Sequence, residues 1–154
     1  MAPTRIFLDA NVLVTVLCNE YPRFTACARV LSLADDPRFE VYTSPLCLAI
    51  GAYFAEKKNG KKKARAKIQI LADKLRITPM NEDAVRQALG NPKVGDLEDG
   101  MHYYSAVAAK CGHIVTYDRK DFHFAVLPVL EPEDFLLEHV VSTGAVRARH
   151  RSGR

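Results

Sequence analysis

The amino-acid sequence predicts an α/β fold: a single-domain, three-layer α/β/α sandwich around a central, mainly parallel sheet of four or five strands. Short apolar runs alternate along the chain with longer segments whose apolar residues recur at helical spacing, which is typical of a parallel sheet covered by helices. Residues 5–8 form an apolar run that nothing polar interrupts after Arg5, as in a strand buried at the centre of such a sheet. A length of 154 residues with a hydrophobic fraction of 48% suits one domain with one core.

The predicted strands are short, rich in β-branched and aromatic residues, and bounded by turn residues. They cover residues 5–8, 39–43, 75–78 and 113–117, and residues 126–130 would add a fifth strand. The second of them, FEVYT, alternates in polarity as strands do, and the third is stopped by Pro79.

The predicted helices cover residues 10–18, 24–33, 46–58, 61–74, 81–89, 101–111 and 132–139. Ser44 and Pro45 read as an N-cap followed by proline at the first helical position, and Gly60 separates two helices. Apolar residues that recur on one side of a helix predict the face that packs against the core. They are Ile68, Leu71 and Leu75 in one helix, and Ala84, Val85, Ala88 and Leu89 in the next.

Several classes of protein are disfavoured. No apolar run approaches the roughly 20 residues that a membrane span needs. A signal peptide is not expected, because Asp9 and Asn11 interrupt the first apolar segment. The four cysteines lack metal-ligand spacing and sit among apolar neighbours, as small core residues do in a reduced cytosol. They are Cys18, Cys27, Cys47 and Cys111. We therefore expect a cytoplasmic protein with no membrane partner.

Positive charge is concentrated in two places. Residues 141–154 contain four arginines and are predicted to be a basic, disordered tail, which leaves residues 1–140 as the folded domain. The second place is a lysine run that would suit the phosphate backbone of a nucleic acid: Lys57, Lys58, Lys61, Lys62 and Lys63. The alternative for this run is the solvated face of a helix.

Asp9 directly follows the first predicted strand. A carboxylate at the carboxyl end of a buried parallel strand lies where open α/β sheets place their ligands. Burying it without a partner would cost several kcal/mol, so a cationic partner is expected. The alternative is that Asp9 caps the helix that begins at Ala10.

Other acids are expected to converge with Asp9. Asp118 ends the fourth strand and so lies at the same edge of the sheet. Asp96 and Asp99 are three residues apart and would share one face at a helix N-terminus, where the helix dipole stabilises them. Grouped carboxylates repel one another, and oxygen ligands that need a divalent cation favour Mg²⁺ or Mn²⁺. The histidines show no clear zinc-ligand spacing with the cysteines; they include His102, His113 and His123.

Three segments resemble the PIN domain, a metal-dependent ribonuclease family many of whose small bacterial members are VapC-type toxins of toxin–antitoxin pairs. They read FLDANVLVTV, DLEDGMHYYSAVAAKCG and IVTYDRKDF, and their order and spacing fit the family between Arg5 and Asp121. The resemblance therefore covers most of the chain and rests on three motifs that agree with one another.

The resemblance implies Mg²⁺ or Mn²⁺ at Asp9, Asp99 and Asp118, which would be the catalytic acids. Asp96 and Asp121 match further acids at the metal site, and Asn11 and Thr116 match polar positions that support it. The implied reaction is metal-assisted hydrolysis of RNA phosphodiester bonds that leaves a 5′-phosphate and a 3′-hydroxyl. The implied partners are an RNA, with tRNA among the candidates, a cognate antitoxin and a second copy of the chain.

One position departs from the family. Where a glutamate is usual on the helix after the second strand, Ile50 appears, and the next carboxylate is Glu56. Six positions correspond to about 600° of rotation, so Glu56 should point elsewhere. The missing acid favours a competing interpretation, a catalytically weakened module that binds RNA or an antitoxin. Retention of Asp9, Asp99 and Asp118 favours the nuclease, because mutually repelling acids bring nothing to a protein that only binds.

Two further hypotheses concern other residues. A phosphotransferase of the haloacid-dehalogenase type also begins with an aspartate on a first strand, but it needs a second one where Asn11 stands. Tyr103 and Tyr104 are candidates for stacking on bases, with core packing or a dimer contact as the alternative. The apolar faces of residues 46–54 and 61–75 are candidates for a homodimer face or an antitoxin groove.

Overall fold

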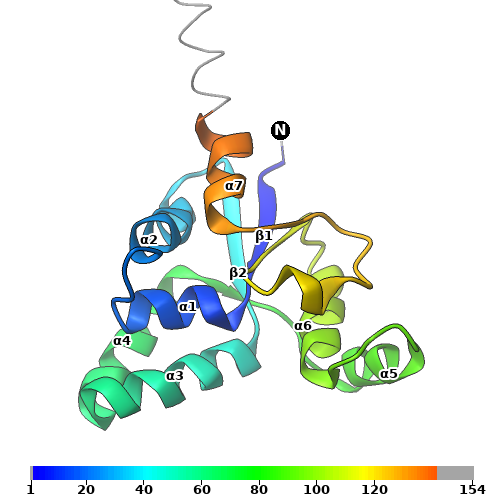
Figure 1. Ribbon diagram of the computed structural model, residues 1–154, viewed down its shortest axis with the longest axis horizontal. Helices are drawn as coiled ribbons and strands as arrows, with labels where there is room; N and C mark the ends of the chain where they lie inside the picture. Colours follow the sequence, from blue (N-terminus) through cyan, green and yellow to red (C-terminus); the bar gives the residue numbers. More distant parts are fainter. Residues whose placement is uncertain (1, 142–154) are drawn as a thin grey trace, which may run out of the picture.

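The computed structural model describes residues 2–141 and contains one sheet of five parallel strands (Figure 1). The strands are β1 (Thr4–Leu8), β2 (Phe39–Thr43), β3 (Arg76–Ile77), β4 (His113–Val115) and β5 (Val129–Leu130), in the order β3-β2-β1-β4-β5. Every neighbouring pair is parallel. The prediction of an α/β fold with the first strand at the centre of a parallel sheet is confirmed. The predicted tail lies outside the described residues, except for Val141.

Helices connect the strands and cover the sheet. They are α1 (Ala10–Leu17), α2 (Phe24–Ser32), α3 (Pro45–Asn59), α4 (Lys61–Lys74), α5 (Glu82–Gly90), α6 (Leu97–Ala108) and α7 (Pro132–Leu136). Short turns of 3₁₀ helix occupy Leu33–Asp35 and Arg119–Phe122, and a π-type turn, Leu137–Val141, extends α7. Figure 1 shows α1, α2, α3 and α4 on one side of β1 and β2, with α5 and α6 on the other. Among residues 2–141, no helix combines the length and the apolar character needed to cross a membrane.

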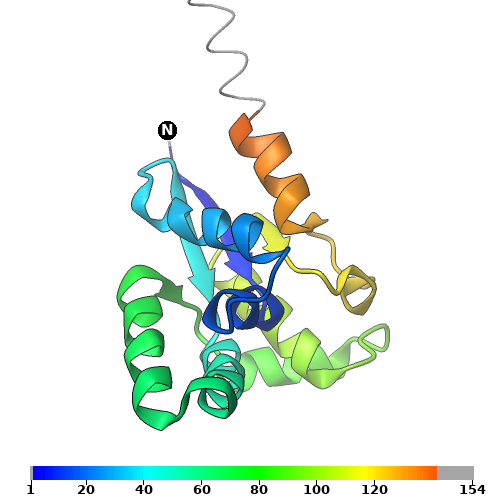
Figure 2. The same cartoon turned by 60° about the vertical axis from the view of Figure 1, so that its left-hand side comes forward.

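The core lies on both faces of the sheet. β1 contributes Ile6, Phe7 and Leu8, all fully buried, and Phe135 of α7 is equally buried. Burying one large apolar side chain stabilises a fold by about 1.5–3 kcal/mol, so this central strand is a main source of stability. All four cysteines are buried and unpaired, as predicted. Figure 2 shows α2 and α7 side by side, where they pack against each other.

Helix α6 begins four residues earlier than predicted. Asp96 is its N-cap, and the carboxylate of Asp96 accepts a hydrogen bond of 2.9 Å from the backbone N–H of Glu98. Gly100, which resembles a helix breaker in the sequence, lies inside the helix and is buried there. Because the helix starts at Leu97, Asp99 belongs to its first turn and not to the preceding loop.

Other expectations need smaller corrections. β3 and β5 have two residues each, shorter than predicted, and β4 ends at Val115 although the Thr116 N–H still donates to the carbonyl of Leu130 at 3.0 Å. Leu89 does not face inward but is 68% exposed, because α5 packs mainly against α6 and Leu89 lies on its outer side. The N-cap at Ser44 with Pro45 at the first helical position is confirmed.

Replacing Gly100 with alanine should destabilise the protein by about 1–3 kcal/mol. A Cβ at Gly100 would lie 2.8 Å from the Cβ of Ala88, an atom fixed to the backbone of α5, and 2.7 Å from Val94 Cγ1. The two helices would have to separate, which outweighs the gain of about 1 kcal/mol in helix propensity. Thermal or urea unfolding measures the change. In Gly90→Ala the new Cβ meets nothing within 4 Å, so this control should unfold like the parent or later. Equal stability of the two variants would contradict the packing argument.

Candidate functional site

The pairing of β1 with β4 brings the two predicted strand-end acids together. Leu8 lies opposite Val115 in the parallel register, and the Asp9 N–H donates to the carbonyl of Val115 at 3.0 Å. Asp9 and Thr116 are therefore the first residues past the ends of two neighbouring strands, and Asp118 follows two residues on. Strands β2 and β4 flank β1, so this edge is the point where the chain order across the sheet reverses, which is where α/β sheets bind ligands.

Asp9 caps helix α1 and also lies among the acids at the edge of the sheet. The helix cap and the site residue, which were alternatives in the sequence, are therefore both present. One carboxylate oxygen, Oδ1, accepts from the backbone N–H of Ala10 at 2.8 Å, as in an N-cap. The other, Oδ2, accepts from Thr116 Oγ1 at 2.8 Å and from Asn11 Nδ2 at 3.3 Å. The side chain is buried and the groups that donate these hydrogen bonds are neutral, so none of these donors balances its negative charge.

Asn11 ties the acids to one another. Its amide Nδ2 lies within hydrogen-bond distance of Asp9, of Thr116 Oγ1 at 3.0 Å and of Asp118 Oδ2 at 3.1 Å. Its Oδ1 accepts from the backbone N–H of Tyr117 at 3.2 Å. Thr116 completes the link, because its Oγ1 also accepts from the N–H of Asp118 at 3.0 Å. Asn11 and Thr116 therefore orient Asp9 relative to Asp118.

The acids line one cavity of about 370 Å³. Its carboxylates come from the end of β1, the first turn of α6 and the turn after β4: Asp9, Asp96, Glu98, Asp99, Asp118 and Asp121. None of the described residues that line it is cationic. The structure thus gathers all five aspartates that the sequence predicted, together with Glu98. Such an all-oxygen donor set fits a hard divalent cation such as Mg²⁺ or Mn²⁺.

Helix α3 supplies an apolar wall to this cavity. Ile50 lines it, as does Phe54 one turn later, whereas Glu56 is not among the lining residues. Ile50 thus faces the acids from the position where the PIN pattern usually has a glutamate. Gly51 allows α3 to lie close to α1, because a Cβ there would come within 2.9 Å of Leu17 Cδ1. Helix α3 therefore contributes only apolar side chains to a cavity whose carboxylates come from three other parts of the chain.

Burial and mutual repulsion raise the pKa of two of these acids. For Asp99, desolvation by burial, followed by the negative charges of Asp9 and Asp96, raises the pKa from its usual 3.8 to about 7. For Asp9, burial is also the largest cause of a raised pKa, and the charge of Asp118 adds to it. Both shifts mean that the folded protein disfavours the charged carboxylates, and a divalent cation bound between them would remove that penalty.

Two buried residues that the sequence did not single out for this site lie behind Asp9. His102 of α6 and Cys47 of α3 are fully buried, and the Cys47 sulfur lies 3.5 Å from His102 Nδ1. They are 55 residues apart, so no spacing rule connects them. One signal was available: His102 follows Asp99 by three residues and therefore shares its helix face.

The lysine run lies at the end of α3 and the start of α4 (Figure 1), and none of its members is among the residues that line the cavity. Lys58 is engaged in the fold, because its ammonium donates to the carbonyl of Cys18 just past α1. Lys61, Lys62 and Lys63 are exposed at the start of α4. The alternative prediction, that the lysine run is the solvated face of a helix, therefore fits these three lysines.

The two tyrosines are part of the packing. Tyr103 is only 5% exposed, and its hydroxyl accepts from the N–H of Val126 at 2.9 Å, so the prediction that it stacks on bases is wrong. Tyr104 is half-buried, and its hydroxyl accepts from Asn91 Nδ2 at 2.9 Å. Packing in the core, the alternative to base stacking, therefore accounts for Tyr103.

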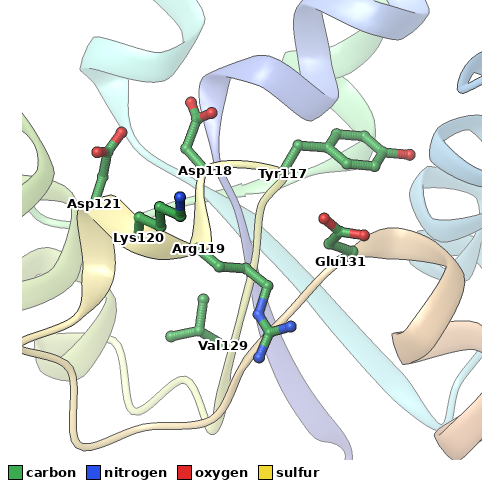
Figure 3. Close-up of a pocket in the computed structure, with 7 residues that line it drawn as sticks. All are labelled: Tyr117, Asp118, Arg119, Lys120, Asp121, Val129 and Glu131. Atoms are coloured by element: carbon green, nitrogen blue, oxygen red, sulfur yellow. The ribbon is translucent and has the colours of Figure 1, made fainter.

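A second pocket, of about 650 Å³, adjoins the acidic cavity (Figure 3). Its lining includes Asp118 and Asp121, which belong to both hollows, and adds Arg119 and Lys120. Figure 3 shows the two aspartates extending the same way from the turn after β4, with Lys120 between them, whereas Arg119 extends the other way past Val129. Two positive side chains therefore lie next to the acidic cavity, in a pocket that Glu131 also lines.

In the absence of divalent metal, we expect the stability of the protein to fall as the pH rises from about 4 to about 7. Asp99 loses its proton near pH 3.8 in the unfolded chain but only near 7 when folded, so the folded state alone binds that proton across this window. Adding Mn²⁺ at pH 7.5 should raise the melting temperature by binding only the folded state. Differential scanning fluorimetry across this range, with EDTA or Mn²⁺, measures both effects. Asp99→Asn should show the weaker pH dependence; an identical profile would contradict this assignment.

Comparison with known proteins agrees with the fold. Among solved structures, the chain is similar to VapBC2 from Rickettsia felis bound to a DNA fragment from its promoter (18% identity, 83% of this chain and 98% of that chain, TM-score 0.62). It is also similar to the sarcin-ricin loop cleaving toxin VapC20 of Mycobacterium tuberculosis (19% identity, 79% and 95%, TM-score 0.62). VapBC-1 from nontypeable Haemophilus influenzae is a third (17% identity, 84% and 99%, TM-score 0.62). At these identities the likeness shows a shared fold. None of the curated proteins compared with the chain matches it.

The sequence itself matches the family profile described as PIN domain over residues 5–120. That span contains β1 to β4 and the helices between them. It also contains every acidic residue that lines the cavity except Asp121. PIN domains are generally nucleases. The chain belongs to the PIN domain family.

Proposed function

We propose that this protein is a metal-dependent endoribonuclease and the toxin of a bacterial toxin–antitoxin pair. The observation that carries the proposal is the acidic cavity, in which carboxylates from three separate parts of the chain meet with no cationic side chain among the described lining residues. A protein that only bound RNA, itself an anion, would be hindered by such a cavity. A hydrolase that uses Mg²⁺ or Mn²⁺ requires one.

Asp9, Asp99 and Asp118 are the proposed metal ligands and catalytic acids, with Asp96 and Asp121 as further ligands. When bound, Mg²⁺ or Mn²⁺ would polarise the scissile phosphate and lower the pKa of a water. The chain's own contribution is orientation. Asn11 contacts Asp9 and Asp118 at once, and Thr116 donates to Asp9 at 2.8 Å, so these two neutral residues hold the ligands at a fixed separation.

Positive side chains beside the cavity would bind the phosphates on either side of the cleaved bond. Arg119 and Lys120 adjoin Asp118 in the chain and line the neighbouring pocket. The lysine run at the α3–α4 turn remains a proposed second contact, farther along the RNA.

Replacing Arg119 and Lys120 together with alanine should weaken the binding of single-stranded RNA and reduce the slope of log K against log salt by about 1–2. The reason is that each lost phosphate contact releases one counterion fewer. Filter binding at several salt concentrations, with EDTA present to prevent cleavage, measures the slope. The double variant Lys61→Ala, Lys62→Ala removes equal charge from the other patch. If only this second pair changes the slope, the RNA lies along α4 and not along the pocket beside Asp118.

The proposed protein partner is an antitoxin. Two of the structures that share this fold are described as VapBC assemblies, and one of those was determined with promoter DNA. Apolar side chains are exposed on α3 and α4, where Tyr53 is 54%, Phe54 44% and Ile70 57% exposed. These helices are the proposed face for the antitoxin or for a second copy of the chain. Co-expression with the product of the neighbouring reading frame, followed by size-exclusion chromatography, tests the antitoxin.

Incubating total cellular RNA with purified protein in Mn²⁺, Mg²⁺ or EDTA tests the nuclease. The expected result is cleavage in either metal, none in EDTA, and products that carry a 5′-phosphate. The second candidate, a weakened module that only binds, is favoured by the apolar wall at Ile50 and Phe54. RNA binding without cleavage in any metal would establish that module in place of the enzyme.

A further inference from the structure

Glu131 is a further acid at the edge of the sheet where Asp9 and Asp118 lie, but it is set apart from them. It directly follows β5, whose Leu130 pairs with Val115 of β4. Its half-buried side chain lines the second pocket, of about 650 Å³, and not the acidic cavity. Among the described residues, its carboxylate has neither a hydrogen bond nor an ion pair. This carboxylate is therefore available to a ligand in the second pocket.

Two cations line the same pocket without pairing with this carboxylate. Arg119 and Lys120 are exposed, and neither side chain forms an ion pair within the part of the chain that the structure describes. In Figure 3, Glu131 and Tyr117 lie on one side of the Arg119 side chain, and Lys120 and Asp121 lie on the other. The two cations offset the negative charge of Glu131, so an RNA strand can approach the pocket. The carboxylate itself repels phosphate and needs a ligand group that donates hydrogen bonds.

Tyr117 gives the second pocket a fixed aromatic wall. Arg23 Cζ lies 4.0 Å from the centre of the Tyr117 ring, and the Tyr117 hydroxyl donates to Glu133 Oε1 at 2.7 Å. These two contacts hold the half-buried ring where it lines the pocket. Proteins bind the unstacked bases of single-stranded RNA against aromatic side chains and read their edges by hydrogen bonds. A pocket of about 650 Å³ has room for one such base.

The two oxygens of a carboxylate distinguish between the four bases of RNA. A carboxylate only accepts hydrogen bonds, and it can accept two that lie side by side. Guanine presents two neighbouring donors, N1–H and the N2 amino group, on its Watson–Crick edge. Adenine and cytosine present one amino group there beside an unprotonated ring nitrogen, and the single N–H of uracil lies between two carbonyl oxygens. A carboxylate therefore suits guanine better than any other base.

We propose that the second pocket binds a guanine base next to the cleaved phosphate, with Glu131 accepting from N1–H and from the N2 amino group. Asp118 and Asp121 line both the pocket and the acidic cavity, so a base held there belongs to a nucleotide beside the metal site. The nuclease then cleaves RNA preferentially next to guanine. This cleavage preference rests on the proposed function, whereas the binding of guanine does not require catalysis.

The binding of short RNAs in EDTA tests the pocket without cleavage. The probes are three fluorescein-labelled oligouridines: one of uridine alone, one with a single central guanosine, and one with inosine in its place. Inosine lacks only the N2 amino group of guanosine. Fluorescence anisotropy should show the guanosine oligomer binding about tenfold more tightly than oligouridine, because a bidentate contact discriminates by this order. The inosine oligomer, which keeps one of the two donors, should lie between them.

Glu131→Gln should abolish the preference for guanosine and leave the affinity for oligouridine unchanged or slightly higher, since one negative charge is removed. The Glu131 side chain has no hydrogen bond or ion pair among the described residues, so the variant should fold like the parent. Asp134→Asn is the matched control, because Asp134 is an exposed acid of α7 that does not line the pocket. This control should keep the preference.

Equal binding of the three oligomers by the parent, or no binding of any of them, would overturn the proposal. A guanosine preference that survives in Glu131→Gln, or that falls equally in Asp134→Asn, would do the same. Cleavage of the same oligomers in Mn²⁺ separates this proposal from the proposed function. Selective binding of guanosine without cleavage means that the nuclease is wrong and the guanine pocket stands. Cleavage by a protein that does not distinguish guanosine means the reverse.

Discussion

Asp99→Asn should reduce metal-dependent RNA cleavage at least about 100-fold while making the metal-free protein more stable at pH 8. The substitution keeps the shape of the side chain in the first turn of α6 but removes a charge from the cavity. Metal-ion catalysis is worth several kcal/mol, and each 1.4 kcal/mol or so corresponds to a tenfold change in rate. Initial rates with a fluorogenic RNA measure the loss. The gain in stability follows from the pKa of about 7, since the folded parent must ionise Asp99 against its neighbours at pH 8 and asparagine need not.

The matched control is Asp83→Asn. Asp83 is also an aspartate in the first turn of a helix, but it is exposed on α5 and does not line the cavity. It should cleave RNA like the parent and show no gain in stability. Retained cleavage in Asp99→Asn would mean that the metal is held by the other acids, or that the activity does not arise from this cavity.

Ile50→Glu should raise the affinity for Mn²⁺ on the order of tenfold, because affinity for hard cations grows with the number of charged ligands. Ile50 lines the cavity from α3, which contributes no carboxylate to it, so a glutamate there would add a charged group to the lining. The same change should lower the melting temperature of the metal-free protein, since it adds a negative charge to an acidic cluster. Isothermal titration calorimetry and differential scanning fluorimetry measure the two effects.

Ile50→Gln is the control that separates the effect of the glutamate charge from the effect of the side chain's shape. Glutamine has nearly the size of glutamate but no charge, so it should leave the Mn²⁺ affinity close to that of the parent. If the two variants bind Mn²⁺ equally, position 50 does not reach the metal, and the apolar wall of α3 is not what distinguishes this site.

The sequence was sufficient to predict the centre of the fold and the acids, because both depend on local patterns. An uninterrupted apolar run predicted β1. The acids after β1 and β4 were expected to meet because parallel strands end at the same edge of the sheet. Even the departure at Ile50 could be located by counting from the N-cap at Ser44, and it lines the cavity as that count predicts.

What escaped prediction depends on contacts between distant segments. The start of α6 was misplaced because Gly100 serves close packing against Ala88, which only the folded structure shows. Cys47 and His102 meet because α3 and α6 come together at the end of β1, although 55 residues separate them. Lys58 read as a free cation, but the position of α3 beside α1 turns it toward the Cys18 carbonyl.

The most direct test of the acidic site is the binding of Mn²⁺ to the metal-free protein by isothermal titration calorimetry, with the parent compared to Asp9→Asn. Asparagine is as good an N-cap as aspartate, so helix α1 should be preserved. The account predicts that Mn²⁺ affinity falls at least about tenfold in the variant and that RNA cleavage falls with it. Unchanged Mn²⁺ affinity in Asp9→Asn, or RNA cleavage by the parent in EDTA, would contradict it.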